Sequence, residues 1–314
     1  MVSPANGGSL QHRDLERKLG EITAGFAARV GVCAVDRTGS SCVNGEETFS
    51  LQSVMKLLVS LAVLDAADRR ELRLSDQVVV HREDLSLYVQ PLADLVGQQG
   101  YRTTIADLIR RAIVDSDSAA ADIMIRRLGG PLLVQRFLER KGIRGVRIDR
   151  DERHLQTEIV GLTWRPEYVD AAKLEKAIAA VPAQQRDEDY RKYQMDVRDT
   201  ATPLGMAMLL QRLASGELLS PASTRYALTT MAQTATFPDR LKAGTPRGWT
   251  CMHKTGTSGS WNGVTAATND VGILRAPDGT YVSVAVFIAD TREPPEARSR
   301  VMREIAAATA ASYR

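Results

Sequence analysis

Segments patterned as strands lie only near the two ends of this chain, and this distribution constrains the fold most strongly. Near the start, residues 29–36 (RVGVCAVD) and 40–49 (SSCVNGEETF) have the composition of two strands joined by a turn. Near the end, residues 249–254, 269–276 and 280–290 have the same character. We therefore expect one sheet assembled from both ends of the chain.

The long middle of the chain is patterned as helices. Leu15, Leu19, Ile22, Phe26 and Val30 have the spacing of an amphipathic helix that precedes the first strand. Helical segments then follow at about residues 53–70, 104–114, 118–130, 131–143, 202–217 and 220–232, and a last one covers 296–313.

These patterns predict an α/β (α+β) fold with an inserted all-helical lobe. The antiparallel sheet has about five strands, and N- and C-terminal helices flank it. We expect the sheet lobe to contain residues 1–50 and 232–314, and the helical lobe to contain residues 51–231.

Composition excludes several classes of function. The chain has 314 residues, 44% of them hydrophobic, and a net charge of +3 with the basic residues spread along the sequence. This charge pattern is typical of a solvated surface rather than of a nucleic-acid-binding protein. No apolar run is long enough to span a bilayer, and the first residues do not have the pattern of a secretory signal. The four histidines show no metal-ligand spacing, so we expect no metal and no cofactor.

Three cysteines are too few for a disulfide framework. Cys33 and Cys42 lie on the two N-terminal strand segments and could face each other across the hairpin. They form either a disulfide or two reduced thiols, and Cys251 is left over.

Ser53 and Lys56 stand at the head of an almost wholly apolar segment, FSLQSVMKLLVSLAVL. On a helix, residues i and i+3 share a face, so the lysine would point toward the serine. A buried lysine needs an anionic partner or acts as a base. Alternatively, Ser53 caps the helix and Lys56 reaches the surface.

Two further motifs follow in order. Ser116-Asp117-Ser118 lies between two helical segments, and Lys254-Thr255-Gly256 lies at the end of a strand. SxxK, SDN and KTG together are the signature of class A β-lactamases and penicillin-binding proteins. From about Val30 to the last helix, the sequence resembles the class A serine β-lactamase family.

The resemblance implies a role for each matching residue. Ser53 matches the acylated nucleophile and Lys56 the SxxK lysine. Ser116 matches the serine that passes a proton to the leaving nitrogen, and Asp117 completes its motif. The backbone N–H groups of Ser53 and Thr257 match the oxyanion hole.

A fourth segment, VRIDRDERHLQTE, is similar to the start of the family's Ω-loop. The match makes Glu152 the carboxylate that activates the deacylating water, or otherwise a solvated charge. Arg150 and Asp199 match the two ends of the loop, which a salt bridge joins in the family. Gln156 replaces the family's asparagine beside the water.

Substrate contacts are also implied by the resemblance. Lys254, Thr255 and Thr257 match the residues that hold the substrate carboxylate, with Gly256 between them. Arg240 matches an arginine with the same task in some class A members, or is a surface residue. Ser118 replaces the asparagine that binds the acylamino side chain.

Two aromatic residues have open assignments. Tyr88 matches the aromatic residue at the mouth of the family's active site, or is a packing tyrosine. Trp261 lies in a short insertion after KTG, around SWNGV, and could line the rim of the site.

The Ω-loop segment, at about residues 150–199, is much longer than is usual in the family. Its part EYVDAAKLEKAIAAV is patterned as a helix. The insertion is either a lid beside the site or a solvated excursion.

The resemblance implies a β-lactamase with a small-molecule β-lactam substrate that works in the periplasm or outside the cell. Without a signal pattern in the sequence, the protein is either cytoplasmic or a trimmed form of an exported one, and we expect a monomer. The alternatives are a related esterase or D-Ala-D-Ala-type peptidase, or a slowly deacylating β-lactam-binding protein.

Overall fold

A computed structural model describes residues 7–314, and the contacts between residues divide the chain into two units. Unit 1 contains the chain up to Val54, Ile143–Val146 and Thr200–Arg314. Unit 2 contains Met55–Gly142 and Arg147–Asp199. The predicted helical lobe, 51–231, extends further than unit 2, because residues 200–231 pack with the sheet.

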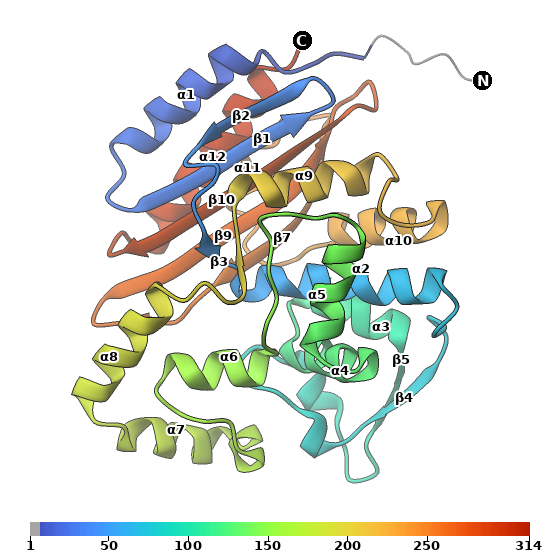
Figure 1. Cartoon of the computed structure of the whole chain (residues 1–314), viewed down its shortest axis with the longest axis vertical. Coiled ribbons are helices and arrows are strands. Elements are labelled where there is room, and N and C mark those ends of the chain that lie inside the picture. Colours follow the sequence, from blue (N-terminus) through green and yellow to red (C-terminus); the bar gives the residue numbers. More distant parts are fainter. Residues whose placement is uncertain (1–6) are drawn as a thin grey trace. The chain divides into compact units, whose positions relative to one another are not determined.

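Unit 1 is built on an antiparallel sheet in the order β2-β1-β10-β9-β7. Its strands are β1 (Arg29–Asp36), β2 (Gly39–Val43), β7 (Thr250–Thr257), β9 (Val264–Arg275) and β10 (Tyr281–Thr291). Both ends of the chain therefore contribute to one sheet, which confirms the predicted fold class (Figure 1).

A short additional strand, β8 (Ser260–Trp261), pairs with β9. The turn between them contains Asn262 and Gly263, both with positive φ. This Asn-Gly turn is the type that two-residue hairpins favour. The short insertion after KTG is thus a β-hairpin.

Helices cover both faces of this sheet. Alternate residues of β1 and β10 form one face and pack against α1 (His12–Ala24) and α12 (Pro295–Ala311). Leu15, Leu19, Met302 and Ile305 provide the helical side of this core, and all four are fully buried. The opposite face carries α9 (Pro203–Ala214), which contacts β1 and β10 (Figure 1).

Local sequence signals explain where α9 and the next helix, α10 (Pro221–Ala232), begin. Thr202 caps α9 by accepting a hydrogen bond from the N–H of Gly205, and Pro203 is the first helical residue. Ser220 and Pro221 do the same for α10. Both starts agree with the sequence pattern.

The smaller elements of unit 1 are β3 (Phe49–Ser50), η1 (Gln52–Val54), β6 (Thr200–Ala201) and α11 (Leu241–Gly244).

Unit 2 is mainly helical, as expected for the middle of the chain. Its first helix, α2 (Met55–Asp68), is buried on every side from Met55 to Ala66. Its main helices are α2, α3 (Ile105–Arg110), α4 (Ser118–Leu128), α5 (Pro131–Arg140), α6 (Glu152–Ile159), α7 (Ala171–Ala180) and α8 (Ala183–Gln194), and its short turns are η2 (Arg82–Asp84), η3 (Pro91–Leu95), η4 (Arg111–Asp115) and η5 (Pro166–Val169). A hairpin of β4 (Gln77–Val80) and β5 (Tyr101–Thr104) completes the unit.

The insertion in the predicted Ω-loop contains α7, as the sequence pattern indicates, and also α8, which that pattern did not predict. Leu174 of α7 and Tyr168 of η5 form a small buried cluster with Leu87, which lies in a different segment of unit 2. Trp164 and Leu162 pack against the same cluster. The insertion is therefore a packed element and not a wholly solvated excursion.

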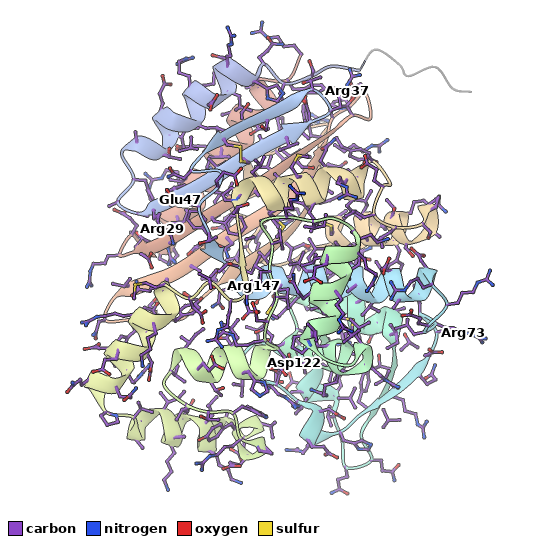
Figure 2. All side chains as sticks on the ribbon, in the orientation of Figure 1. Arg29, Arg37, Glu47, Arg73, Asp122 and Arg147 are labelled. Atoms are coloured by element: carbon purple, nitrogen blue, oxygen red, sulfur yellow. A yellow bond between two sulfur atoms is a disulfide. The ribbon has the colours of Figure 1, made fainter. Side chains whose placement is uncertain are left out.

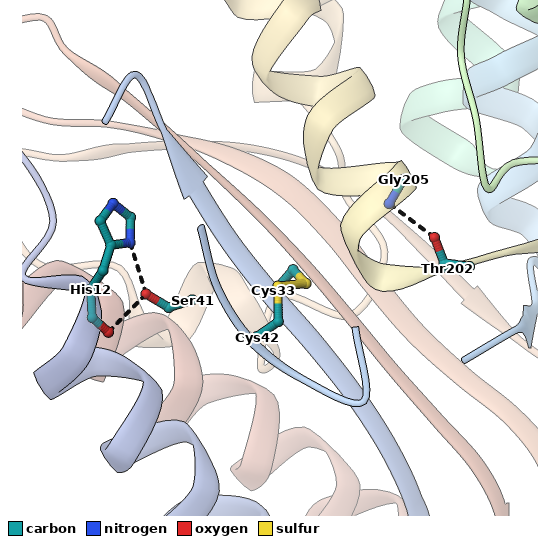
Figure 3. Close-up of a disulfide and its surroundings, with 6 residues drawn as sticks. All are labelled: His12, Cys33, Ser41, Cys42, Thr202 and Gly205. Atoms are coloured by element: carbon teal, nitrogen blue, oxygen red, sulfur yellow. Dashed lines mark hydrogen bonds between the residues drawn. A yellow bond between two sulfur atoms is a disulfide. The ribbon is translucent and has the colours of Figure 1, made fainter. Parts of the chain in front are cut away.

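Cys33 and Cys42 are joined by a disulfide across β1 and β2 (Figure 3). The two residues are register partners in the antiparallel pair. Cys251 is a free, buried thiol.

Among residues 7–314, no helix is both long enough and apolar enough to cross a membrane.

We predict that replacing both Cys33 and Cys42 with alanine lowers the free energy of unfolding by about 2–3 kcal/mol. The reason is that a cross-link closing a short loop restricts the unfolded chain. Urea denaturation with and without a non-thiol reductant measures the effect. The reductant should lower the midpoint of the parent protein and leave the double variant unchanged. Three titratable thiols in the unreduced, unfolded protein would contradict the prediction.

Candidate active site

The candidate nucleophile Ser53 lies in unit 1 on the turn η1, two residues before α2 begins. The sequence predicted it at the helix start itself. Ser53 is half-buried between the buried residues Gln52 and Val54, so its hydroxyl is not sealed in the core. Gln52 has a φ of 47°, which is a rare conformation for a residue with a side chain.

The KTG motif of β7 packs directly against this turn. A Cβ atom placed on Gly256 would lie 2.7 Å from the Leu51 carbonyl oxygen and 3.2 Å from the Ser53 nitrogen. Only glycine fits this approach without displacing the backbone. The backbone of Gly256, the residue before Thr257, therefore lies close to the backbone of Ser53 within unit 1.

The two residues that precede this glycine are also buried. Lys254 is fully buried, and its ammonium donates a hydrogen bond of 2.8 Å to the backbone oxygen of Thr255. The hydroxyl of Thr255 shares a hydrogen bond of 2.6 Å with that of Thr236. A buried ammonium group is suited to binding a carboxylate, although Lys254 lies within β7 and not at its end as the sequence predicted.

Arg240 belongs to the same part of unit 1. It is buried, so the alternative of a surface arginine is wrong. Its guanidinium donates hydrogen bonds to the Thr257 hydroxyl (2.8 Å) and the Asn269 carbonyl oxygen (2.9 Å), and it lies 3.8 Å from the ring centre of Phe237. Burial lowers the pKa of Arg240 to about 10, against the opposing effect of Asp270, so it is charged at neutral pH.

In unit 2, Lys56 is fully buried and held by three oxygen atoms. Its ammonium donates hydrogen bonds to the backbone oxygen of Ser116 (2.6 Å) and the hydroxyl of Ser118 (3.0 Å). The Glu152 Oε1 atom lies 3.4 Å away. Lys56 therefore does not reach the surface, and the side chain of Ser118 points toward this lysine.

A turn with unusual backbone geometry carries Ser116. The five residues before it, Arg111–Asp115, form a turn of π-helix, and Ser116 itself has a φ of 58°. Asp117 then caps α4 by accepting the N–H of Ala120 (2.8 Å), and it also accepts the N–H of Leu92 (2.7 Å). Burial raises the pKa of Asp117, although these N–H groups oppose the shift. Such π-turns and left-handed residues are frequent at functional sites.

Glu152 is the first residue of α6 and is almost completely buried. The amide of Gln156, one helical turn further on, donates to Glu152 Oε2 at 3.3 Å. The backbone N–H of Glu152 donates to Asp122 Oδ1 at 2.8 Å. Glu152 is thus not a solvated charge. Gln156, although one methylene longer than the family's asparagine, still forms a hydrogen bond with it.

The two ends of the Ω-loop segment are joined by an ion pair, as the resemblance implies. Arg150 Nε lies 2.6 Å from Asp199 Oδ2. Asp199 Oδ1 also accepts the backbone N–H groups of Asp149 (2.7 Å) and Arg150 (3.0 Å). A second contact joins Arg150 to Glu158 at 2.6 Å. The long insertion therefore begins and ends at one tightly bonded point.

Tyr88 is 54% exposed and has a φ of 59°, so it is not a packing residue of the core. The next residue, Val89, accepts a hydrogen bond of 2.8 Å from the N–H of Ser118. Trp261 lies on β8 and is half-buried.

Sequence reasoning missed Asp122, which lies on α4 (Figure 2). It is fully buried, accepts the N–H groups of Glu152 and Arg153, and is bonded to the Ser86 hydroxyl at 2.7 Å. Burial raises the pKa of Asp122 to about 7, and the charges of Asp151 and Glu152 add to the shift. An aspartate among the apolar residues of SAAADIMI was the only available signal.

Sequence reasoning also missed the polar run Thr268-Asn269-Asp270 in the middle of β9. Asp270 Oδ1 lies 2.9 Å from Nδ1 of His253, the residue of β7 that directly precedes Lys254. Asn269 binds the backbone before Ser53. Three consecutive polar residues in the interior of a buried strand were a usable signal, since buried polar groups require partners.

Comparison with known proteins shows the family of the chain. Residues 14–313 match the model of the β-lactamase enzyme family. The chain belongs to the β-lactamase enzyme family. It is a hydrolase of the class A type, with the same mixed fold as the solved members.

Individual relatives cover almost the whole chain. The extended-spectrum β-lactamase PER-1 of Pseudomonas aeruginosa is 29% identical over 95% of this chain and 87% of its own length. A β-lactamase of Streptomyces albus G is 30% identical over 91% of this chain and 80% of its own length. The crystal structure of the TLA-1 extended-spectrum β-lactamase aligns with a TM-score of 0.79 at 26% identity, over 96% of this chain and 98% of that one.

We predict that Asp122→Asn removes a pH dependence of the stability of this β-lactamase. A carboxyl group whose pKa rises from 3.8 to about 7 on folding stabilises the fold fully below pH 3.8. That contribution is lost as the pH rises through 7, by up to about 4 kcal/mol. The parent should therefore lose stability between pH 4 and 8 relative to the variant, as measured by urea denaturation at each pH.

Asp278→Asn is the control for this experiment. The Tyr313 hydroxyl holds the pKa of Asp278 at about 2, below its usual range. Its contribution is present above pH 4 and is lost only toward pH 2. The two variants should thus differ from the parent in opposite pH ranges. Parallel stability curves for Asp122→Asn and the parent from pH 4 to 8 would contradict the prediction.

Proposed function

We propose that this chain hydrolyses β-lactams through an acyl-enzyme on Ser53. The observation that carries the proposal is the buried group of Lys56, Glu152 and Ser116, because an ammonium and a carboxylate are held there with little solvent. Only two residues of the chain separate Lys56 from Ser53. Nucleophilic catalysis by a serine requires a base close to it, and this short spacing along the chain supports the proposal.

In the acylation step, the Ser53 Oγ atom attacks the carbonyl carbon of the four-membered ring and loses its proton. Lys56 or Glu152 accepts that proton, directly or through a water molecule. The N–H groups of Ser53 and Thr257 stabilise the negative oxygen, an effect on the order of 100- to 1000-fold in rate for each donor. The carbon–nitrogen bond then breaks, and the nitrogen receives a proton through Ser116.

In the deacylation step, Glu152 removes a proton from a water molecule that attacks the ester carbon. The ester bond breaks, Ser53 recovers its proton, and the ring-opened acid leaves. The contact between Gln156 and Glu152 supports this step, because an amide in that place restricts the carboxylate and can bind the water. The slow-deacylating alternative is the outcome expected if the longer Gln156 places the water poorly.

We propose that Lys254, Thr255, Thr257 and Arg240 bind the carboxylate of the substrate. Lys254 and Arg240 supply two buried cations, and the Thr257 hydroxyl is already bonded to Arg240. Tyr88 would flank the acyl side chain. Ser118 already accepts a hydrogen bond from Lys56. Its short hydroxyl is therefore less available to the acyl side chain of the substrate than an asparagine amide would be.

The enzyme would act outside the cytoplasm, where β-lactams act. The Cys33–Cys42 disulfide supports this location, because disulfides persist in oxidising compartments. We also propose that the substrate is a small molecule and that the enzyme works as a monomer.

We predict that Lys56→Ala lowers the rate constant of acylation by benzylpenicillin by about 100- to 10,000-fold. The replaced ammonium is the group that orders Ser116, Ser118 and Glu152. Stopped-flow measurement of ring opening gives the rate, and circular dichroism checks the fold. Lys192→Ala, which removes an exposed lysine paired with Asp189 on the same helix, is the control. Acylation of Lys56→Ala at the parent rate would refute the assignment.

We predict that Glu152→Gln accumulates a covalent adduct of one benzylpenicillin per chain. The amide keeps the shape of the side chain but cannot remove a proton from water. Intact-protein mass spectrometry after mixing should show the adduct in the variant and free enzyme in the parent. A lasting adduct in the parent itself would favour the β-lactam-binding protein. Ester hydrolysis without any reaction with β-lactams would favour the esterase or peptidase.

A further inference from the structure

Asn269 is a buried residue of β9 whose side chain contacts the chain just before the nucleophile. Its Nδ2 atom donates hydrogen bonds to the backbone oxygens of Ser50 (2.8 Å) and Leu51 (2.9 Å). Ser53 follows two residues after Leu51. Both donor hydrogens of one amide are therefore used to fix the segment that enters the turn η1.

The same point of the sheet contacts the turn a second time. Asn269 is the register partner of Gly256 on β7. Gly256 is the residue whose missing Cβ lets the strand approach Leu51 and Ser53. One cross-strand pair thus holds the turn on two sides, by hydrogen bonds from Asn269 and by close packing of Gly256.

The turn depends on such support, because its backbone is not relaxed. Gln52, between the clamped segment and Ser53, has a φ of 47° and is buried. Residues in this conformation persist only where the surrounding structure fixes them. The Leu51 oxygen also accepts the N–H of Val54 at 3.1 Å, so Asn269 binds the carbonyl that closes the turn around Ser53.

The amide of Asn269 is not explained by packing alone. Its Oδ1 atom is buried and has no hydrogen-bond partner among the residues described by the structure. An unpaired buried acceptor is unfavourable for folding. The chain retains it together with the two donated bonds, which points to a function of the donor in placing the turn.

We propose that Asn269 is a positioning residue that sets the place of the Ser53 hydroxyl and N–H for attack on an acyl or phosphonyl centre. The inference rests on Ser53 being the nucleophile, as in the proposed function. It acts on the covalent step and not on substrate binding, since the hydrogen bonds that its side chain donates among residues 7–314 go to the backbone before the nucleophile. A displacement of about 1 Å in such a group lowers the rate about 100-fold.

Two variants separate positioning from packing. Asn269→Asp keeps the shape but replaces two donors with a carboxylate facing two carbonyl oxygens. Asn269→Ser is neutral and shorter, and it decides the matter if the aspartate variant does not fold. Asn44→Asp is the matched control, because Asn44 Nδ2 also donates to a backbone oxygen of unit 1, that of Val30 (2.8 Å), at the end of β2.

Two probes measure the reactivity of Ser53. Benzylpenicillin acylates it by ring opening, and an alkyl fluorophosphonate forms an oxygen–phosphorus bond with loss of fluoride and of the hydroxyl proton. The dependence of the rate on probe concentration gives a binding constant and a rate constant for the covalent step. Melting curves identify the temperature at which each variant is folded.

We expect the covalent rate constant to fall about 100-fold in the Asn269 variants with both probes, with the binding constants unchanged. Asn44→Asp should lower the melting temperature without changing the rate constant. An unchanged rate constant in folded Asn269 variants would overturn the proposal. If the parent reacts with the fluorophosphonate but not with penicillin, the β-lactamase function fails, while the fluorophosphonate series still tests Asn269. No labelling of Ser53 by either probe would overturn both.

Discussion

The structure of unit 2 depends on a lysine, Lys56, whose ammonium group is buried away from solvent. A buried ammonium group loses its hydration, and the loss is tolerated only where oxygen atoms replace the water. Lys56 has three such atoms, from Ser116, Ser118 and Glu152. The three oxygen atoms come from different positions of unit 2. The backbone segments that carry them must therefore be folded so that all three atoms reach the ammonium group.

That requirement accounts for the unusual backbone of unit 2. Ser116 presents its carbonyl oxygen from a left-handed residue that ends a π-turn. Glu152 is fixed at the start of α6, where Asp122 accepts its N–H and Gln156 binds its carboxylate. The Arg150–Asp199 pair closes the segment that carries Glu152. The insertion, with its own small cluster on Leu87, extends this segment without opening that closure.

Unit 1 meets a different requirement, which is to hold a strained turn in one place. The close approach of Gly256 and the two hydrogen bonds of Asn269 act on the same few backbone atoms before Ser53. A sheet is a suitable support because β7 and β9 are paired along their whole shared length. Ser53, the proposed nucleophile, is therefore supported by two fully paired strands, and rigid support is what precise catalysis needs.

The sequence by itself determined the fold class, the caps of α9 and α10, and the ordered motifs of Ser53, Lys56, Ser116 and Lys254, because these depend on local periodicity and short spacings. Only the tertiary structure decided that residues 200–231 pack with the sheet and that Ser118 faces Lys56. It also decided that Asp122 and Asn269 hold the segments of Glu152 and Ser53. These contacts join residues from 30 to more than 200 positions apart, and such pairs are chosen by packing and by the need to satisfy buried polar groups, which no local pattern records.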